Sequence, residues 1–474
     1  MNHYIHFRKL HLGWVLLLMA LLVTPIVEAQ TVITSKGTNH HIIEEKSQSL
    51  KVEYEGEISL GPDDRYITSI SDGGYIRIEK TTFGNKRELF ISSRGNELDY
   101  EYKEGGRKKP FDPTGKAWLA DLLPELLQST TIAAEARVDR IYSSGGAKGV
   151  VNELRNLKSD HVKAKYATLL MGKNLRDSEV PMVIDAIGEN IRSDHFRAEI
   201  FKQHHQMLLS NPRNQGAFLK AVETIGSDHY KTELVKLLVK NHSTSGQQQQ
   251  LLQLIGTIQS DHYRAEILNQ VPNDFSDREM DFLLGQLVPE IKSDHYKSEV
   301  LGRIMKRGDK LNSKNIDAMI HATGGINSDH YRNNTLKDLV KSQSLSAQNY
   351  ETLFSTLGRY NSDHYKSEFM QLMVKEGKHL QNYGQFIQEA SKVKSDFHRS
   401  EILLSLLGKV KLSEEQLLTL ISSVSNMSSD HFKAEVLKKS CQANGEQKVK
   451  AAIREAAKSI KSTHFSNEVL RCAS

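Results

Sequence analysis

The chain has 474 residues, with 63 Lys and Arg against 58 Asp and Glu and a formal net charge of +5. Because the charges nearly balance and the basic residues are spread along the sequence, the composition argues against a nucleic-acid-binding protein. Hydrophobic residues at 38% and charged residues at 26% are typical of a water-facing chain with room for two or three domains.

The N-terminus has the three parts of a secretory signal peptide. Arg8 and Lys9 precede an apolar run at 12–23, and Ala29 lies at the small-residue position of a cleavage site. Residues 1–29 are therefore predicted to be removed, which places the mature protein outside the cytoplasm, in the periplasm or secreted. The alternative is an uncleaved N-terminal membrane anchor, although the run is shorter than the roughly 20 residues of a spanning helix. No other membrane span is expected.

A small β unit is predicted after a leader. Residues 30–49 are polar and unpatterned, and we expect a flexible leader there. From Leu50 onward, apolar residues alternate with charged ones, and Gly, Asn and Asp turns such as Asp72-Gly-Gly break the runs. This pattern is typical of short antiparallel strands, so residues 50–112 are predicted to form an all-β unit of about five strands.

Residues 113–158 are predicted to be a helical linker with a degenerate first repeat. Pro113 opens a helix that is expected to run to about Gln128. A helix pair follows, with Gly145 and Gly146 marking its turn.

Several phrases in this part of the chain resemble a known bacterial module. They are Ser69-Ile-Ser-Asp-Gly-Gly-Tyr-Ile-Arg-Ile, Arg87-Glu-Leu, Pro110-Phe-Asp, Lys116-Ala-Trp-Leu-Ala and Ala134-Glu-Ala-Arg-Val. Similar extracytoplasmic segments are appended to membrane zinc peptidases of the beta-lactam-sensor type, and also occur in free-standing proteins. The resemblance covers roughly residues 50–170, and the similar segments carry no function of their own that transfers to this chain. A sensory or regulatory role related to such modules is an alternative. The chain has no His-Glu-x-x-His motif, so peptidase activity is not implied.

The remainder, residues 159–474, repeats one heptapeptide, which is clearest at 293–299 as Ser-Asp-His-Tyr-Lys-Ser-Glu. Near-copies begin at Ser159, Ser193, Ser227, Ser260, Ser293, Ser328, Ser362, Ser395, Ser429 and Ser462. The spacing of 33–35 residues is the signature of a repeat architecture. Ser is a favoured N-cap and Asp suits the first helical turn, so each copy is predicted to begin a helix.

A second helix is predicted in each repeat after a polar linker. Ser276 with Glu279, and Ser413 with Gln416, indicate capping boxes at two of these helices. The predicted fold class is therefore mainly α: an α-solenoid of about ten helix–turn–helix repeats, similar in length to HEAT and tetratricopeptide repeats, behind a small β unit.

The His and Glu of the heptapeptide lie four residues apart on one helical face and form a candidate ladder. Its clearest copies are Ser193, Asp194, His195 and Glu199; Ser227, Asp228, His229 and Glu233; and Ser293, Asp294, His295 and Glu299. One hypothesis is that His and Glu bind zinc. One helix supplies only two ligands, however, and Lys165 and Asn334 stand where two of the copies would have Glu. We therefore predict a structural ladder in which His bonds to its Glu or to the adjacent repeat, with no metal.

Cys441 and Cys472 fall on consecutive repeats and could form a disulfide in an oxidising compartment. The sequence holds no nucleophile elbow, P-loop or dinucleotide fingerprint, so no catalytic residue and no cofactor are predicted. The leading hypothesis is a non-catalytic exported scaffold that binds a protein or peptide partner through an extended surface. The alternatives are the sensory or regulatory role above, or an enzyme with an unrecognised site on the repeats.

Overall fold

The computed structural model describes residues 29–35, 38–45, 48–95, 97–240, 245–271, 275–306, 311–377, 380–443 and 446–474. It divides into two compact units, Met1–Leu170 and Met171–Ser474. The predicted signal peptide lies almost entirely outside the described residues, so its cleavage stays a prediction. No helix in the described ranges has the length and apolar character that a membrane crossing requires.

The first unit contains a seven-stranded antiparallel sheet with the order β1-β2-β3-β6-β7-β8-β9. Its strands are β1 (Ala29–Ser35), β2 (Thr38–Glu45), β3 (Gln48–Glu55), β6 (Tyr75–Thr82), β7 (Asn85–Arg94), β8 (Glu97–Glu104) and β9 (Arg107–Lys109). β4 (Ile58–Leu60) and β5 (Ile67–Ile70) pair separately as a short ribbon. The unit thus has more than the five strands expected.

The prediction of a flexible leader at 30–49 was wrong, because β1 and β2 pair there in regular antiparallel register and β2 continues onto β3. Thr31, Val32 and Ile33 are β-branched and favour strand. No strand was predicted because apolar and polar residues do not alternate there. Strands pair through backbone groups, however, and such pairing does not itself require an alternating pattern.

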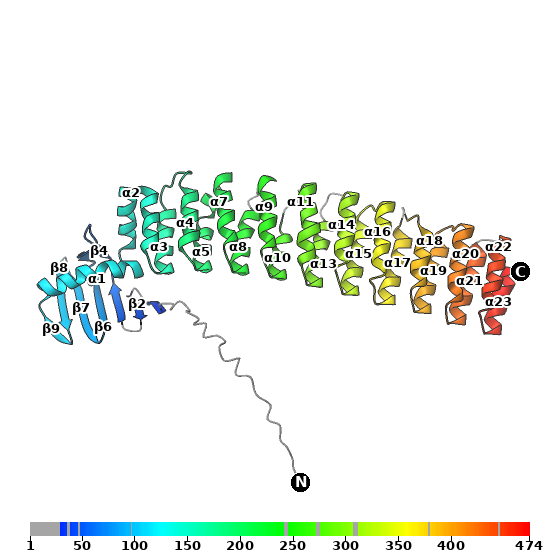
Figure 1. Cartoon of the computed structure of the whole chain (residues 1–474), viewed down its shortest axis with the longest axis horizontal. Coiled ribbons are helices and arrows are strands. Elements are labelled where there is room, and N and C mark those ends of the chain that lie inside the picture. Colours follow the sequence, from blue (N-terminus) through cyan, green and yellow to red (C-terminus); the bar gives the residue numbers. More distant parts are fainter. Residues whose placement is uncertain are drawn as a thin grey trace, which may run out of the picture. The chain divides into compact units, whose positions relative to one another are not determined.

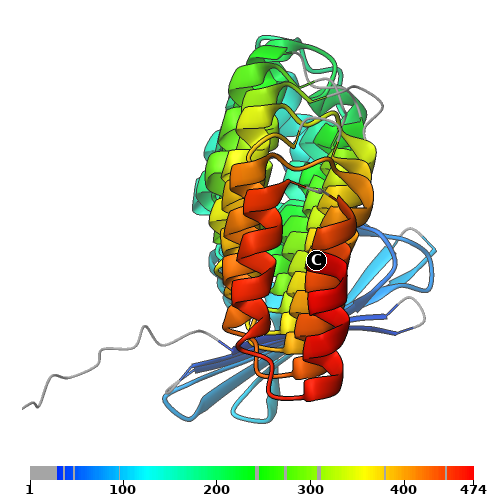
Figure 2. The ribbon, with the colours of Figure 1, turned by 90° about the vertical axis from the view of Figure 1, so that its right-hand side faces the viewer.

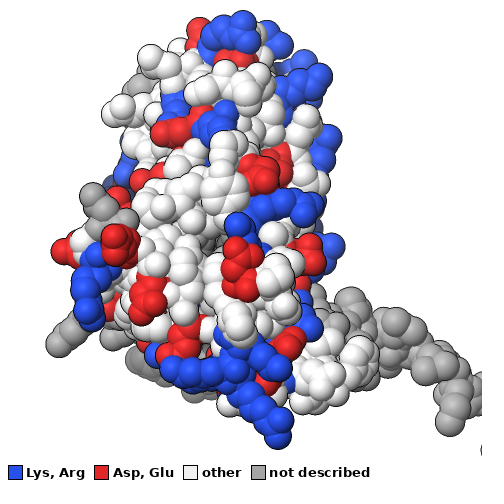
Figure 3. All heavy atoms as spheres, turned by 90° about the vertical axis from the view of Figure 1, so that its left-hand side faces the viewer, with Lys and Arg blue, Asp and Glu red and all other residues white. Residues whose placement is uncertain are grey.

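One face of the sheet is covered by α1 (Lys116–Ser129), which follows η1 (Phe111–Gly115) and lies across the strands (Figure 1). Ile76, Ile78, Leu89 and Ile91 are fully buried in one cluster with the apolar face of α1. Charged side chains of both signs are interspersed over the face seen in Figure 3, and ion pairs such as Arg87–Glu104 join strands.

Two more helices complete this unit, α2 (Ala134–Asn156) and α3, which runs from Asp160 to Met171. α2 is two helices joined across a break at Gly146, whose φ of 60° lies in the left-handed region where glycine carries no Cβ penalty. The predicted helix pair with a turn at Gly145–Gly146 is therefore present.

The second unit is built from helices in two rows (Figures 1 and 2). The first row consists of α5 (Asp194–Gln203), α8 (Asp228–Lys240), α10 (Asp261–Leu268), α13 (Asp294–Met305), α15 (Asp329–Ser342), α17 (Asp363–Glu376), α19 (Asp396–Lys409), α21 (Asp430–Ala443) and α23 (Thr463–Ala473). Each packs against the next member of its row. All of them begin at the second residue of a heptapeptide copy.

The second row is made by the helices between them. It comprises α4 (Val180–Asn190), α7 (Pro212–Glu223), α9 (Ser245–Gly256), the run of α11 (Asp277–Phe282), η2 (Leu283–Leu287) and α12 (Val288–Glu290), then α14 (Ser313–Thr323), α16 (Ala347–Leu357), α18 (Tyr383–Ser391), α20 (Glu414–Ser425) and α22 (Gln447–Ala457), with short α6 (His205–Leu208) ahead of α7. The predicted capping boxes at Ser276 and Ser413 are both present. The architecture is mainly helical and repeat-like, and its apolar core lies between the rows.

Candidate functional site

The serine of the heptapeptide stands where the sequence predicts, at the residue before each first-row helix. Ser193, Ser293 and Ser395 have extended backbones, and their hydroxyls accept from the amide three residues on at 3.4, 3.5 and 3.4 Å. These distances are long for a hydrogen bond, so the hydroxyl is a weak cap.

The aspartate makes the stronger contact, and it reaches the next repeat. Asp261 Oδ2 accepts from the backbone amides of Lys292 and Ser293 at 2.9 and 2.7 Å. The same bond to the following serine amide is made by Asp194, Asp228, Asp294, Asp329, Asp363, Asp396 and Asp430, at 2.7–2.8 Å. Because a carboxylate on an amide is a charge-assisted bond, each repeat holds the turn that begins the next helix.

A buried cation, which the sequence analysis overlooked, follows the aromatic residue. The set is Arg197, Lys231, Arg264, Lys297, Arg332, Lys366, Arg399 and Lys433, each at most 8% exposed. Most of these cations donate to groups at or just after the C-terminus of a second-row helix: Lys433 Nζ reaches Ser459 O at 2.9 Å and Lys231 Nζ reaches Thr257 Oγ1 at 3.0 Å. A cation there satisfies unpaired acceptors and complements the helix dipole.

Burial lowers the pKa of several of the lysines in this set. Removal from water lowers the pKa of Lys231 and of Lys297, and neighbouring Asp side chains only partly oppose this effect. Burial also lowers the pKa of Lys366, although Glu389 lies 3.4 Å from its Nζ. The signal that could have revealed the set is Lys or Arg at the fifth position of nine of the ten copies.

The histidines form an exposed row of alternating imidazole and aromatic rings. His262 lies 5.6 Å from Tyr296 of the next repeat, and the Tyr296 hydroxyl lies 3.2 Å from His262 Nδ1. Similar ring contacts, tilted or edge-on, join His195 to Tyr230, His229 to Tyr263, His295 to Tyr331, His330 to Tyr365 and His431 to Phe465. We call this row the His–aromatic ladder.

The heptapeptide glutamates pair mainly with the preceding repeat rather than with their own histidines. Glu233 contacts Lys202 at 3.0 Å, Glu266 contacts Lys236 at 2.5 Å, and Glu299 accepts from Asn269 at 2.7 Å. Contacts between His and Glu of one copy are present at His398–Glu401, at 3.1 Å, and at His464–Glu468, at 3.6 Å. Of the two bonding modes expected for His, contact with the adjacent repeat is therefore the commoner among the described residues, and it is made to the aromatic ring of the next copy.

The described residues contain no group of three or more His, Cys, Asp or Glu side chains arranged to hold a metal ion. Cys441 and Cys472 are paired as a disulfide between α21 and α23, with their Cα atoms 6.3 Å apart.

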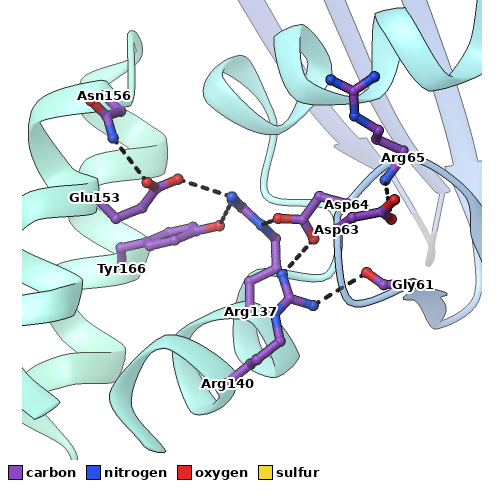
Figure 4. Close-up of polar contacts among 9 residues, drawn as sticks. All are labelled: Gly61, Asp63, Asp64, Arg65, Arg137, Arg140, Glu153, Asn156 and Tyr166. Carbon is purple, nitrogen blue, oxygen red and sulfur yellow. Dashed lines mark hydrogen bonds and ion pairs between the residues drawn. The ribbon is translucent and has the colours of Figure 1, made fainter. Parts of the chain in front are cut away.

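A buried polar cluster in the first unit was also missed (Figure 4). Arg137 on α2 donates to Asp64 and to Glu153, both at 2.9 Å, and to the Tyr166 hydroxyl. Arg140 adds a second bond to Asp64 at 2.5 Å. Burial raises the pKa of Tyr166 to about 12. The cluster ties the β4–β5 turn to α2 and α3, and Arg137 belongs to the Ala134–Val138 phrase noted in the sequence.

Among the described residues, pockets lie along the second row of the second unit. A cleft of about 520 Å³ lies along α4, α7 and α9, lined by Pro181, Pro212 and Gly216 among others. A smaller pocket of about 340 Å³ lies beside η2 and α14, lined by Leu284, Pro289 and Lys297 among others. Both have volumes in the range of ligand sites in proteins.

Comparisons with known proteins add little. No protein-family model matches the chain, and no curated protein matches it. One solved structure, from the computational design of self-assembling cyclic protein homo-oligomers, aligns with 72% of this chain and 92% of its own, at 10% identity. The TM-score of that alignment is 0.11, so it supports no conclusion.

Proposed function

We propose that this chain is a non-catalytic, exported α-solenoid scaffold that binds a protein or peptide partner through an extended surface. The observation that carries the proposal is that some residues of the heptapeptide bond within the packed helices whereas its His is exposed. Its Asp and its buried cation are engaged inside the helical stack, as Asp261 on Ser293 and Lys433 on Ser459 show. Its His is exposed, in a row that crosses from one first-row helix to the next.

Such a row suits an elongated partner. Stacked helical repeats present extended surfaces, and a repeated exposed group lets one partner make many similar contacts. Imidazole and aromatic rings offer both apolar area and hydrogen-bonding groups, which favour protein interfaces. The signal peptide would bring this surface to a partner outside the cytoplasm.

The test is partner capture followed by a purified binding assay. Mature protein immobilised on beads is exposed to a cell-envelope extract, the retained polypeptide is identified, and its Kd is measured with both proteins pure. The ladder variant carries His229→Ala, His262→Ala and His295→Ala. The control variant carries Ser355→Ala, Gln388→Ala and Ser422→Ala on exposed second-row positions.

We expect a polypeptide that binds the pure protein, with a Kd at least tenfold weaker for the ladder variant and unchanged for the control variant. Failure to isolate any polypeptide that binds the pure protein would contradict the scaffold proposal. Equal binding by the ladder variant would leave a scaffold but remove the ladder as its contact surface.

A further inference from the structure

We propose that the pocket beside Lys297 captures the C-terminal carboxylate of a peptide whose last residue is aliphatic. The inference deepens the proposed function, on which it rests, by naming one contact site and its ligand chemistry. The pocket lies wholly within the second unit. Its walls are Leu284, Gly285, Pro289, Lys297, Ala318, His321, Ala322 and Gly325.

Lys297 supplies a positive group that the protein itself leaves poorly satisfied. The residue is 5% exposed, and its Nζ makes one hydrogen bond, to Gly325 O at 3.3 Å. An ammonium group has three donors, and a buried donor without a partner is costly. Within the described ranges no ion pair of Lys297 is found, whereas Arg332 pairs with Asp329 and Lys366 with Glu389.

Among the described residues, the nearest carboxylates do not form an ion pair with the Lys297 ammonium. Asp294 and Asp261 act on Lys297 only through their charge. The carboxylate of Asp261 already accepts from Lys292 and Ser293, and that of Asp294 accepts from Asn327 and Ser328. A carboxylate that entered the pocket would give the ammonium the charged acceptor it lacks.

The other lining groups suit an aliphatic side chain. Leu284, Pro289, Ala318 and Ala322 are apolar, and small residues keep the space open. A Cβ added at Gly325 would lie 3.2 Å from Lys297 Nζ, so a larger residue there would crowd the amine. The π-helical turn η2 forms one wall, and such turns are frequent at functional sites.

A peptide end fits better than a free acid in this setting. A volume of about 340 Å³ is at the small end of ligand pockets in proteins, so the pocket has room only for the end of a peptide. Gly285 and Pro289 on one side and His321 on the other are exposed, so the pocket opens to the surface and the rest of a chain can continue outside. Capture of a terminal carboxylate is an established way to recognise peptides.

The experiment is calorimetric titration of the full-length mature protein with three probes. The first is acetyl-Ala-Ala-Ala-Leu with a free carboxylate, the second is the same peptide as its C-terminal amide, and the third is hexanoate. We expect the acid peptide to bind and the amide and hexanoate each to bind at least tenfold more weakly. Lys297→Met and Gly325→Ala should each weaken the acid peptide at least tenfold.

The matched control is Lys231→Met, which removes the equivalent buried amine of α8, whose Nζ has Thr257 as its partner. It should leave binding unchanged, and circular dichroism checks that each variant is folded. If Lys297→Met does not fold, Gly325→Ala and the contrast between acid and amide still decide.

Equal binding of acid and amide, equal loss in Lys231→Met, or tighter binding of hexanoate would each overturn the proposal. Absence of peptide binding in a protein that still captures a polypeptide partner would refute the pocket alone and leave the scaffold proposal standing.

Discussion

The Asp261 carboxylate lies 2.7 Å from the backbone nitrogen of Ser293, the residue that precedes the next first-row helix. It also accepts from Lys292 N at 2.9 Å, so one side chain satisfies two amides of the following repeat. The Ser293 hydroxyl, by contrast, lies 3.5 Å from the amide it caps. The repeats are thus held more by the aspartate than by the serine.

Asp261→Ala should destabilise the protein more than Ser293→Ala does. Two amides lose their acceptor in Asp261→Ala, for a cost of about 2–3 kcal/mol. Ser293→Ala should cost about 0.5 kcal/mol, the low end for a helix cap, because its bond is long. Urea denaturation followed by circular dichroism measures both. A larger loss in Ser293→Ala would show that the hydroxyl is the principal cap after all.

Removal of a buried cation should cost more still. Arg332 is 3% exposed and donates to Asp329 and to Arg359 O, both at 2.7 Å. Arg332→Met leaves these acceptors buried without their donor, for a loss of about 3 kcal/mol in the free energy of unfolding. The control is Arg303→Met on the exposed face of α13, which should change it by less than about 0.5 kcal/mol. Similar small effects in both variants would mean that the buried arginine is dispensable.

The His–aromatic ladder should contribute modestly and without metal. His295 packs between Tyr296 and Tyr331, with ring centroids 5.1 and 5.7 Å away, yet it is exposed. His295→Ala should therefore cost about 0.5–1 kcal/mol, the range for an aromatic pair. EDTA should leave the Tm of the wild-type protein and that of His295→Ala unchanged. A chelator-induced drop in wild type that is absent in His295→Ala would demonstrate a metal ion on the ladder.

Tyr166 should make stability fall at high pH. Burial raises the pKa of Tyr166 from the ordinary value of 10 to about 12. The unfolded chain therefore loses this proton first, so the stabilising contribution is complete below pH 10 and declines as pH rises toward 12. A difference of about two pKa units corresponds to about 2–3 kcal/mol. Tyr166→Phe should flatten this part of the stability profile, and an unchanged slope would contradict the assignment to Tyr166.

The sequence predicts the helical part of the fold well, because its signals are local and repeated. Every serine of the motif precedes a helix, since cap preference and the 33–35-residue period act together. The strands at 29–45 were missed because residues 30–49 lack the alternating pattern, which pairing between backbone groups does not require. Contact of His with the adjacent repeat was one of two modes expected, but the bond from Asp to the next repeat was not predicted.

The buried cations were missed for a different reason. Lys and Arg on a helix are normally exposed, so their repetition in the sequence did not indicate burial. Burial of Lys297 or Arg332 makes sense only once the end of a second-row helix is seen beside each side chain. The Arg137 cluster likewise joins Asp64, Glu153 and Tyr166 across long stretches of sequence, and no spacing rule brings them together.

The aspartate bonds all run in one direction along the chain, from Asp194 to Ser227 and finally from Asp430 to Ser462. During synthesis, the acceptor of each bond is therefore made about one repeat before its donors. A newly made repeat meets a carboxylate that is already in place, so ordering can spread from the N-terminal repeats as the polypeptide lengthens. A fragment cut from the C-terminal side ends in a solvated carboxylate, whereas one cut from the N-terminal side begins with two amides that have lost their acceptor. The stack has a built-in order of assembly.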